Sequence, residues 1–543
     1  MHWDGSARAH AAASAAVVAA VAVVILVGSP VLGWFQVVRV SAVLLPVLLV
    51  PAVASTPWRW SDQDWALLAG WQPTKHVLAF AAGAATLLLA WIVFSRFQAG
   101  GINAVDFTVY FDRPLFQSSR AHWYFVESTD DARFDNLTHL AVHGYWILLP
   151  LAALYWVYAS PYWLLALSVA AVVAGSVYVY WIVRRIGGSG ILAVAAALAF
   201  LLNDNTARTL NYGFHAEVLY AWFITWAIDA GLRRSRASFL AAVIASALVK
   251  EDAIFPLVAV STALALTGTA RWARGETMVF LVLPAVIGVL SLGLFYQIAV
   301  PRMSPTGNVM YSFFWASQGA TPLQALRGLL SHPRTLVAGL LTSGFFSIVL
   351  VRHFFLPMIA WRWILGLLPM LLIYGVSDND QVREFGIYYA IPLVPFLSIA
   401  SAVAARRVAG YILDPHRAEV LAATLVVLSA LTVGLGYSVR PWKAELAGVQ
   451  KALETLGLDT VVLVQSGLYP HAGYAPTVKL LALNSLSNPD YHNAIVLLAP
   501  GLSAYPLTPS QRRCLEALPS AGTMPGGLMA VRLDGHHASC LVR

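Results

Sequence analysis

The chain has 543 residues, of which 59% are hydrophobic and only 11% are charged. Soluble domains are roughly one quarter charged, so this composition excludes a single soluble globule. The formal net charge of +8 does not indicate nucleic-acid binding, because Lys and Arg cluster in short loops between apolar segments, where membrane topology explains them.

Apolar segments recur from the N-terminus to about residue 438, each close to the ~20 residues with which a helix crosses a bilayer. A helix satisfies its own backbone in lipid, whereas barrel strands would show short alternating segments. The first segment is longer than the core of a signal peptide and a second follows at once, so we expect an uncleaved helix. The predicted spans are 12–33, 38–56, 77–97, 162–183, 190–203, 215–232, 237–252, 254–269, 277–300, 336–352, 356–376, 385–404 and 418–438.

Basic loops orient these spans, because short loops rich in Lys and Arg stay in the cytoplasm. The rule is satisfied only if the apolar segment 139–158 begins and ends on the outer side, as a juxtamembrane or re-entrant helix. Its central Pro150 and many aromatics suit that place. The result is about thirteen spans, with the N-terminus in the cytoplasm and the C-terminus outside. The basic loops are 184–185, 233–236, 271–274 and 406–407.

This topology collects the concentrated polar chemistry on the outer side of the membrane. A random scatter of polar residues would not separate so cleanly between the two sides. The outer segments are 98–138, 203–217, 250–252, 301–335 and 377–389.

After Trp442 the composition changes to short apolar runs separated by turn signals. With an amphipathic helix at its start, the segment 443–543 predicts a small extracytoplasmic α/β domain. Both cysteines of the chain, Cys514 and Cys540, lie in it. An exported domain with two cysteines is a disulfide candidate, and two unpaired core thiols are the alternative. The predicted helix is 444–458, and the predicted strands lie within 458–465, 477–483, 493–499 and 527–533.

Two acids, Asp106 and Asp112, stand in the segment DFTVYFDRPLF, just outside the membrane. On a helix its aromatics share one face, with Asp112 opposite and Asp106 at the edge. We expect a short interfacial helix that ends at Pro114, with the aromatics at headgroup level and the acids facing water. A carboxylate in this place can act as a general base for an acceptor hydroxyl. The alternative is that Asp106 caps the helix and Asp112 lies on a solvated face.

Ionisable residues also stand where predicted spans begin or meet. His215 and Glu217 begin one span, and their spacing does not match a HExxH zinc site, so we assign no metal ligands. Lys250, Glu251 and Asp252 interrupt an apolar run and need partners or water, with an exposed hairpin tip as the alternative. Lys250 can bind a phosphate as a point charge.

Arg383 precedes two adjacent tyrosines, of which Tyr388 is the first, at a predicted membrane surface. A bidentate guanidinium beside aromatic hydroxyls suits a phosphate or diphosphate, and an anchoring role is the alternative. His471, in a turn of the C-terminal domain, is expected to be structural. The chain has no Walker loop, no GxGxxG after a strand and no CxxC, which argues against an ATPase, a Rossmann enzyme or a redox carrier.

The order of these motifs resembles a family of bacterial polytopic proteins described only as predicted membrane proteins, which looks like a branch of the GT-C superfamily of glycosyltransferases. The resemblance covers about residues 77–500 and rests on DFTVYFDRPLF, HLAVHGYWILLPLAALYW, FHAEVLY, VKEDAIFPL, YYAIPLVPFL and VQSGLYPHAGY, in that order. It implies an all-α polytopic core over 77–442 with the external loop 98–138. The segment 1–76 then adds two transmembrane helices, and 443–543 is the exterior domain.

GT-C enzymes transfer a sugar from a polyprenyl phosphate or diphosphate to an acceptor on the outer side of the membrane. The resemblance therefore implies a glycosyltransferase of the bacterial plasma membrane, whose acceptor is an envelope glycan, lipid or protein. Asp106 stands where the family's essential acid stands, with Asp112 second. His215, Glu217, Lys250, Glu251 and Asp252 match motif positions of substrate binding, to which Arg383 and Tyr388 are added. Where the family often has His before Tyr, this chain has Ile387, which argues against a ligand there.

No nucleotide cofactor is implied, because the sugar arrives activated. GT-C branches with and without a divalent cation leave magnesium or manganese open. Two other functions compete with the transferase. A transporter or flippase for lipid-linked sugars would show inverted repeats and charges at the midplane, and neither is visible. A non-catalytic scaffold for envelope assembly, with the exterior domain as a binding module, is the third hypothesis.

Overall fold

Most of the chain from residue 62 onward is described by the computed structural model. The predicted spans 12–33 and 38–56 lie outside the described residues. The described residues are 62–540, apart from 121–137, 268–271, 305–313, 320–321, 412, 432–436, 438–439, 458, 483, 488 and 534–539.

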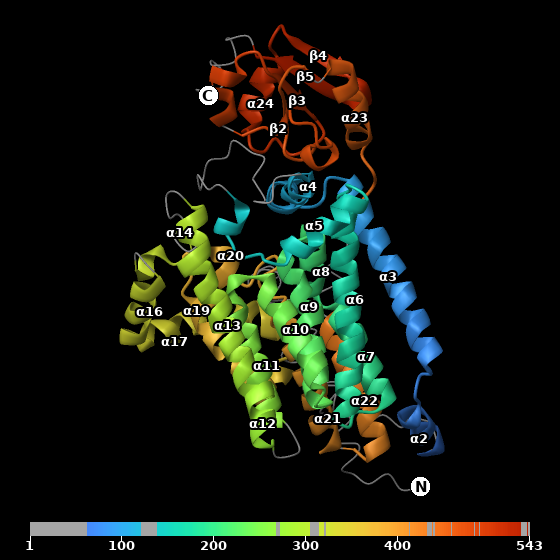
Figure 1. Ribbon diagram of the computed structural model, residues 1–543. Helices are drawn as coiled ribbons and strands as arrows, with labels where there is room; N and C mark the ends of the chain where they lie inside the picture. The colour runs from blue at the N-terminus through green and yellow to red at the C-terminus, as the bar shows by residue number, and fades with distance from the viewer. Residues whose placement is uncertain are drawn as a thin grey trace, which may run out of the picture.

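Helices dominate the described chain, and they form a bundle with a small sheet domain at one end (Figure 1). The apolar helices pack along their lengths, because each buries its side chains against a neighbour. The bundle elements are α2 (Asp62–Gly70), α3 (Lys75–Gln98), α6 (Tyr162–Arg185), α7 (Gly190–Leu202), α8 (Asp204–Tyr212), η3 (Ala216–Leu219), α9 (Tyr220–Leu232), α10 (Arg236–Val249), η4 (Glu251–Ala253), α11 (Ile254–Thr267), α12 (Arg274–Thr277), η5 (Met278–Val282), α13 (Leu283–Leu294), η6 (Phe295–Ala299), α14 (Val300–Met303), η7 (Ala316–Gln318), α16 (Pro322–Ser331), α17 (Pro333–Thr342), η8 (Phe345–Leu350), η9 (Val351–His353), α18 (Leu356–Ile359), η10 (Trp361–Trp363), η11 (Leu365–Leu367), α19 (Leu368–Gly375), α20 (Asp380–Arg383), α21 (Val394–Gly410) and α22 (Pro415–Leu431).

Among the described residues, four helical stretches are long and apolar enough to cross a membrane. A fifth is the pair α7 and α8, which bends by 42° where Asn203 ends one helix and caps the next. The asparagine Oδ1 accepts the Asn205 amide at 2.9 Å and so starts α8 afresh. The total of thirteen spans stays a prediction. The four stretches are Lys75–Gln98, Tyr162–Arg185, Arg274–Met303 and Pro333–His353.

Two predicted spans are not continuous helices, and those predictions are wrong. The span 356–376 consists of the short turns α18, η10, η11 and α19, which follow Phe354 and Phe355 with left-handed φ values of 52° and 55°. In the span 385–404 the helix α21 begins only at Val394. Pro392 lies in the turns before it, and a proline inside a helix would remove a hydrogen bond and clash with the preceding turn. Tyr388 therefore lies in a turn rather than on a helix.

The first external loop forms η1 (Asp106–Asp112), a π-helix, followed directly by α4 (Arg113–Arg120). The predicted end at Pro114 is wrong. The chain widens into π-type turns, in which the Arg113 amide bonds the Thr108 carbonyl five residues back, and this accommodates the proline ring. The expectation that Asp112 faces water is also wrong, because the residue is only 2% exposed. The segment 139–158 contains only η2 (His139–Ala141) and the short α5 (Leu148–Val157).

The C-terminal domain is an α/β unit, as the sequence predicts. Its sheet has the order β2-β1-β3-β5-β4, in which β1 pairs in parallel with β2 and β3, and β5 pairs antiparallel with β3 and β4. The predicted disulfide between Cys514 and Cys540 is present. The elements are α23 (Ala444–Leu456), β1 (Val462–Val464), η12 (Tyr469–His471), β2 (Val478–Leu480), η13 (Asn484–Ser487), η14 (Pro489–Tyr491), β3 (Ile495–Leu498), α24 (Pro509–Glu516), β4 (Ala521–Met524), η15 (Pro525–Gly527) and β5 (Leu528–Arg532).

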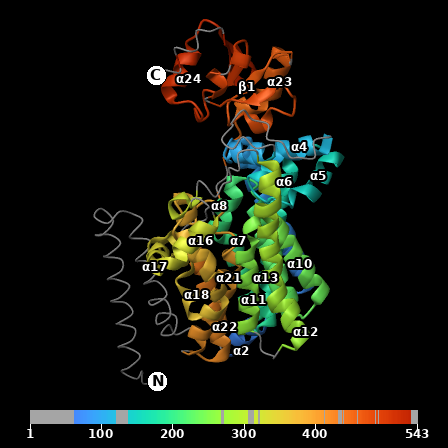
Figure 2. The ribbon, with the colours of Figure 1, turned by 60° about the vertical axis from the view of Figure 1, so that its left-hand side comes forward.

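The external loop joins this domain to the bundle. Both views place α4 between the bundle and the sheet domain (Figures 1 and 2). Val109 of η1 packs into the apolar core that α23 and the sheet share. The Arg113 guanidinium donates to the carbonyls of Gly473 at 2.7 Å and Val478 at 3.0 Å. The helix that carries both candidate acids is therefore held from above by the C-terminal domain.

Candidate functional site

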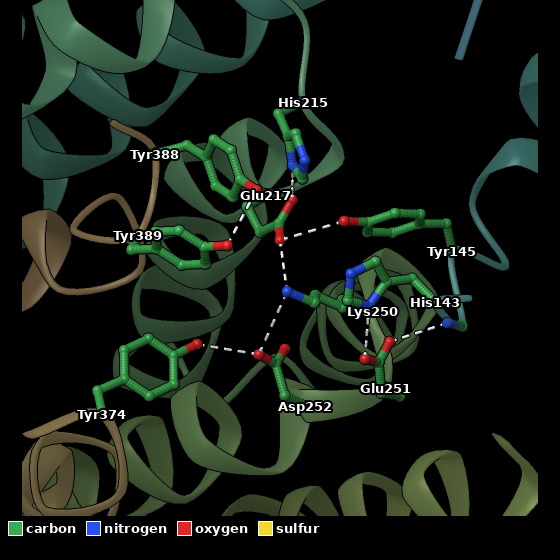
Figure 3. Close-up of polar contacts among 11 residues, drawn as sticks. His143, Tyr145, His215, Glu217, Lys250, Glu251, Asp252, Tyr374, Tyr388 and Tyr389 are labelled. Atoms are coloured by element: carbon green, nitrogen blue, oxygen red, sulfur yellow. Dashed lines mark hydrogen bonds and ion pairs between the residues drawn. The ribbon is translucent and has the colours of Figure 1, made fainter. Parts of the chain in front are cut away.

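A cluster of charged and aromatic side chains lies where several helices of the bundle end (Figure 3). It draws on η3, on the junction between α10 and α11, on the loop between η2 and α5, and on the turns before α21. Helix ends leave backbone groups unpaired and change the chain direction, so neighbouring residues can point into one space. Every charged member of this cluster is buried or half-buried.

Lys250 is the central cation of the cluster. Its Nζ donates to Glu217 Oε1 at 2.8 Å and lies 3.8 Å from Asp252 Oδ2. The lysine and glutamate side chains are 5% and 4% exposed. The exposed hairpin tip is thus excluded for these residues. Charges buried this deeply persist only when they are paired, and Lys250 is held between two carboxylates.

His215 stands on the other side of Glu217. Its Nδ1 contacts Glu217 Oε2, and its ring stacks on Tyr388 with centroids 3.5 Å apart. The Tyr388 hydroxyl donates to the Tyr389 hydroxyl at 3.2 Å, and Lys250 Nζ lies 5.8 Å from the centre of the Tyr389 ring. The predicted residues His215, Glu217, Lys250 and Tyr388 therefore meet in one network.

Glu251 and Asp252 each hold a different neighbour. Glu251 Oε1 contacts His143 Nδ1 at 2.8 Å, while its Oε2 accepts the Gly144 amide at 2.8 Å. Asp252 Oδ2 accepts the Tyr374 hydroxyl at 3.0 Å. The two acids thus tie the α10–α11 junction to the loop before α5 and to α19.

A cavity of about 170 Å³ lies beside the cluster. One end carries charged and hydroxyl groups, and the rest of the wall is apolar and aromatic. The polar end consists of His143, Lys250, Glu251, Asp252, Tyr374 and Tyr389. The apolar wall includes Phe255, Leu292, Phe295, Phe314, Leu329 and Ile373.

Asp106 approaches the cluster from the external loop. Its Oδ2 accepts the Tyr212 hydroxyl, which also accepts from Asn103 Nδ2 at 2.5 Å. The Tyr212 ring meets the Tyr388 ring edge to face, with centroids 5.2 Å apart. Asn103, not Asp106, makes the capping bond of this helix, because its Oδ1 accepts the Asp106 amide at 3.1 Å. The Asp106 carboxylate therefore does not cap its own helix; it reaches the cluster through Tyr212 and does not line the cavity.

Two predicted site residues lie elsewhere. Asp112 accepts hydrogen bonds from Tyr155 at 2.7 Å and Tyr474 at 2.9 Å, below the C-terminal domain. Burial raises the pKa of its carboxyl to about 6. The Arg383 guanidinium pairs with Asp380 in the same short helix and does not line the cavity.

A family model for predicted membrane proteins, DUF2079, matches residues 103–472. The chain belongs to the DUF2079 family. The matched stretch contains both the external loop with Asp106 and all of the cluster, so this DUF2079 chain carries its candidate site within the part that defines the family. It is an integral membrane protein with several apolar helices.

Two solved structures are similar to this DUF2079 chain at low identity. The structure of ArnT from Cupriavidus metallidurans bound to undecaprenyl phosphate is 12% identical, with 86% of this chain and 99% of that chain covered and a TM-score of 0.49. The arabinofuranosyltransferase AftD from Mycobacteria is 14% identical, with 86% and 40% covered and a TM-score of 0.42. No curated protein matches the chain.

Sequence reasoning missed several members of the site in this DUF2079 chain. His143 and Tyr145 lie in the segment expected to form a juxtamembrane or re-entrant helix, Tyr212 ends a short polar helix, Tyr374 was not singled out, and Tyr389 was noted only as the neighbour of Tyr388. The signal for His143 was a polar His-Gly pair inside an apolar segment. Within the described residues no three His, Cys, Asp or Glu side chains are arranged to hold a metal ion.

Proposed function

We propose that the protein is a membrane glycosyltransferase that moves a sugar from a polyprenyl-phosphate or polyprenyl-diphosphate donor to an envelope acceptor. One observation carries the proposal: the cavity joins a charged, hydroxyl-rich end to a long apolar wall. A lipid-linked sugar has the same two parts. The sugar and phosphate suit the polar end, while the first part of the polyprenyl chain suits the apolar wall. The motif order that resembles GT-C enzymes supports the same class.

The roles of the residues follow from their positions. Lys250 Nζ lies at the cavity and is fixed by Glu217 and Asp252, so it offers its remaining N–H to the donor phosphate. Asp106 lies on the external loop and is separated from Lys250 by the Tyr212 and Tyr388 rings. In the proposed reaction its carboxylate accepts the proton of the acceptor hydroxyl as that oxygen attacks the anomeric carbon. The Tyr212 hydrogen bond orients this carboxylate and leaves its second oxygen for the acceptor. Arg383 is left out of the donor site because it faces Asp380.

The proposal includes a location. The protein lies in a bacterial plasma membrane with its N-terminus in the cytoplasm, and the cluster, the external loop and the C-terminal domain lie on the outer side. The positive-inside distribution of Lys and Arg supports this orientation. The disulfide between Cys514 and Cys540 supports it independently, because disulfides persist in oxidising compartments.

The test is sugar transfer by the purified full-length protein from synthetic polyprenyl-phosphate and polyprenyl-diphosphate sugars. Wild type is compared with Asp106→Asn and with the matched control Asp380→Asn, whose carboxyl is exposed and pairs with Arg383. Transfer that collapses in the first variant and persists in the second supports the proposal. Equal transfer by all three removes Asp106 from the mechanism but keeps the enzyme class. Tight lipid binding without transfer, over a broad panel, favours the transporter or scaffold hypotheses.

A further inference from the structure

The pair His143–Glu251 has the geometry of an oriented proton donor at the cavity. The two side chains are 9% and 10% exposed, and both line the cavity. His143 Nδ1 lies 2.8 Å from Glu251 Oε1, and the second carboxylate oxygen is fixed by the Gly144 amide at 2.8 Å. Figure 3 shows the carboxylate bridging the imidazole and this backbone amide. The carboxylate is thus held from both oxygens and cannot turn away from the ring.

This arrangement decides which nitrogen of His143 can exchange a proton. An ionised carboxylate only accepts hydrogen bonds, so Nδ1 carries its proton toward Glu251. The other nitrogen, Nε2, has no hydrogen-bond partner in the described part of the chain. A carboxylate behind an imidazole also stabilises the protonated ring. Burial, with the nearby Lys250 ammonium, lowers the pKa of this imidazole, so Nε2 holds its proton only against the negative charge of a bound donor phosphate and releases it readily from there.

Lys250 is less suited to this task. Two carboxylates, those of Glu217 and Asp252, surround its ammonium group and stabilise its charged form. His143 has one carboxylate partner, and histidine is the side chain whose ordinary pKa lies nearest to neutral pH. Of the described residues that line the cavity, only these two carry a basic side chain.

We propose that His143 is the general acid for the leaving phosphate and that Glu251 is its positioning residue, a role that rests on the glycosyltransferase function proposed above. When the acceptor oxygen bonds to the anomeric carbon, the bond from that carbon to the phosphate oxygen breaks and its electron pair stays on the phosphate. A donor phosphodiester with one negative charge then becomes a monoester that develops a second. The proton on His143 Nε2 passes to that oxygen, while the acceptor proton goes to Asp106, so charge and protons balance.

The experiment measures transfer with two donors that carry the same sugar, a polyprenyl phosphate and a polyprenyl diphosphate, whose leaving group spreads the developing charge further. The main variant is His143→Asn, because its amide still donates to Glu251 and preserves the packing but carries no transferable proton. We expect kcat to fall about 100-fold or more with the monophosphate donor. The loss is expected to be at least several-fold smaller with the diphosphate, while KM for either donor changes little.

A second variant, His143→Ala, tests the same role by chemical rescue. Added imidazole is expected to restore part of kcat, with a pH dependence that follows the added base. Glu251→Gln lowers kcat without rescue, because the amide has one oxygen for two donors. The matched control is His353→Ala, which removes a histidine of similar burial that bonds Asn203 and Ser401 outside the cavity; imidazole should not restore any activity it loses.

The outcomes separate the two proposals. Equal losses in His143→Asn with both donors, together with no imidazole rescue of His143→Ala, would show a structural role and overturn the assignment of the general acid. Wild-type protein that transfers no sugar from either donor would refute the glycosyltransferase function itself, and this role with it. Donor-dependent loss with rescue supports both.

Discussion

Asp112 allows a sharp test of how the C-terminal domain docks on the external loop. Asp112 is 2% exposed, and its Oδ1 accepts hydrogen bonds from both the Tyr155 and Tyr474 hydroxyls. Burial raises its pKa from 3.8 to about 6, despite those hydrogen bonds and the nearby Arg113. The docked state therefore favours the neutral carboxylic acid. At neutral pH, where the free carboxyl is ionised, the free energy of docking is less favourable. Stability from this group is fully present below pH 3.8 and is lost as the pH rises through 6.

The substitution Asp112→Asn keeps the accepting oxygen and removes the charge. A shift of about 2 pKa units corresponds to about 3 kcal/mol between the free and the buried carboxyl, so at pH 7.5 the variant should dock more tightly than wild type, by up to about 100-fold. At pH 5 wild type is mostly protonated when docked, and the advantage should shrink to at most about 10-fold. By contrast, Asp112→Ala leaves two buried hydroxyls without an acceptor and should weaken docking by about 1–3 kcal/mol at both pH values.

The assay is hydrogen exchange of peptides covering η12 and β2, corrected for the intrinsic pH dependence of exchange. His471 lies in the same interface, and burial lowers its pKa to about 4. Undocking of the C-terminal domain therefore also depends on pH through this histidine. The contribution of His471 to the docking free energy is the same in wild type and Asp112→Asn, so it cancels in the difference between them. Lower protection in Asp112→Asn than in wild type at pH 7.5, or a difference that does not shrink at pH 5, would refute the reasoning.

Three further outcomes follow from the packing. In Glu217→Gln the buried Lys250 loses its main partner, so we expect about 3–5 kcal/mol of lost stability, largely recovered when Lys250→Met is added; thermal unfolding in detergent checks this. Arg383→Ala breaks an exposed ion pair with Asp380 and a hydrogen bond to the Ser377 carbonyl at 3.2 Å, so stability should change by less than about 1 kcal/mol and transfer by less than twofold, and a tenfold loss of kcat would return Arg383 to the donor site. In Gly175→Ala the new Cβ would lie 2.4 Å from the Ala221 carbonyl oxygen, so α6 and α9 must move apart; the unfolding temperature should fall, with about 1–3 kcal/mol lost, and an unchanged value would contradict the close approach.

The site was predicted best where charges interrupt apolar sequence. His215, Glu217, Lys250, Glu251 and Asp252 stood out because each is costly near lipid unless paired. The structure joins four of them through Glu217 and Lys250, while Glu251 bonds His143 and the Gly144 amide beside them. Asp106 was found by position in a motif, and its bond to Tyr212 is consistent with a place at the edge of the cluster.

The failures have physical causes as well. Asp112 was expected to face water because a helical projection does not include the domain that covers it; Tyr474, more than 300 positions later, supplies the missing surface. Arg383 looked like a phosphate ligand, but its neighbour Asp380 takes up the guanidinium. Tyr388 and Tyr389 were placed at the start of a helix, whereas turns before α21 carry them.

The sequence by itself determined that the chain crosses a membrane as apolar helices, that an α/β domain follows them, and where the charged residues interrupt the helices. These properties depend on local composition and periodicity, since hydrophobic length and hydrogen-bond satisfaction in lipid act on each segment separately. Only the tertiary structure decided which charges are partners. The contacts of Glu251 with His143, of Lys250 with Glu217 and of Asp112 with Tyr474 join residues that are 108, 33 and 362 positions apart. Such contacts depend on how whole helices and the C-terminal domain pack, which no local pattern contains.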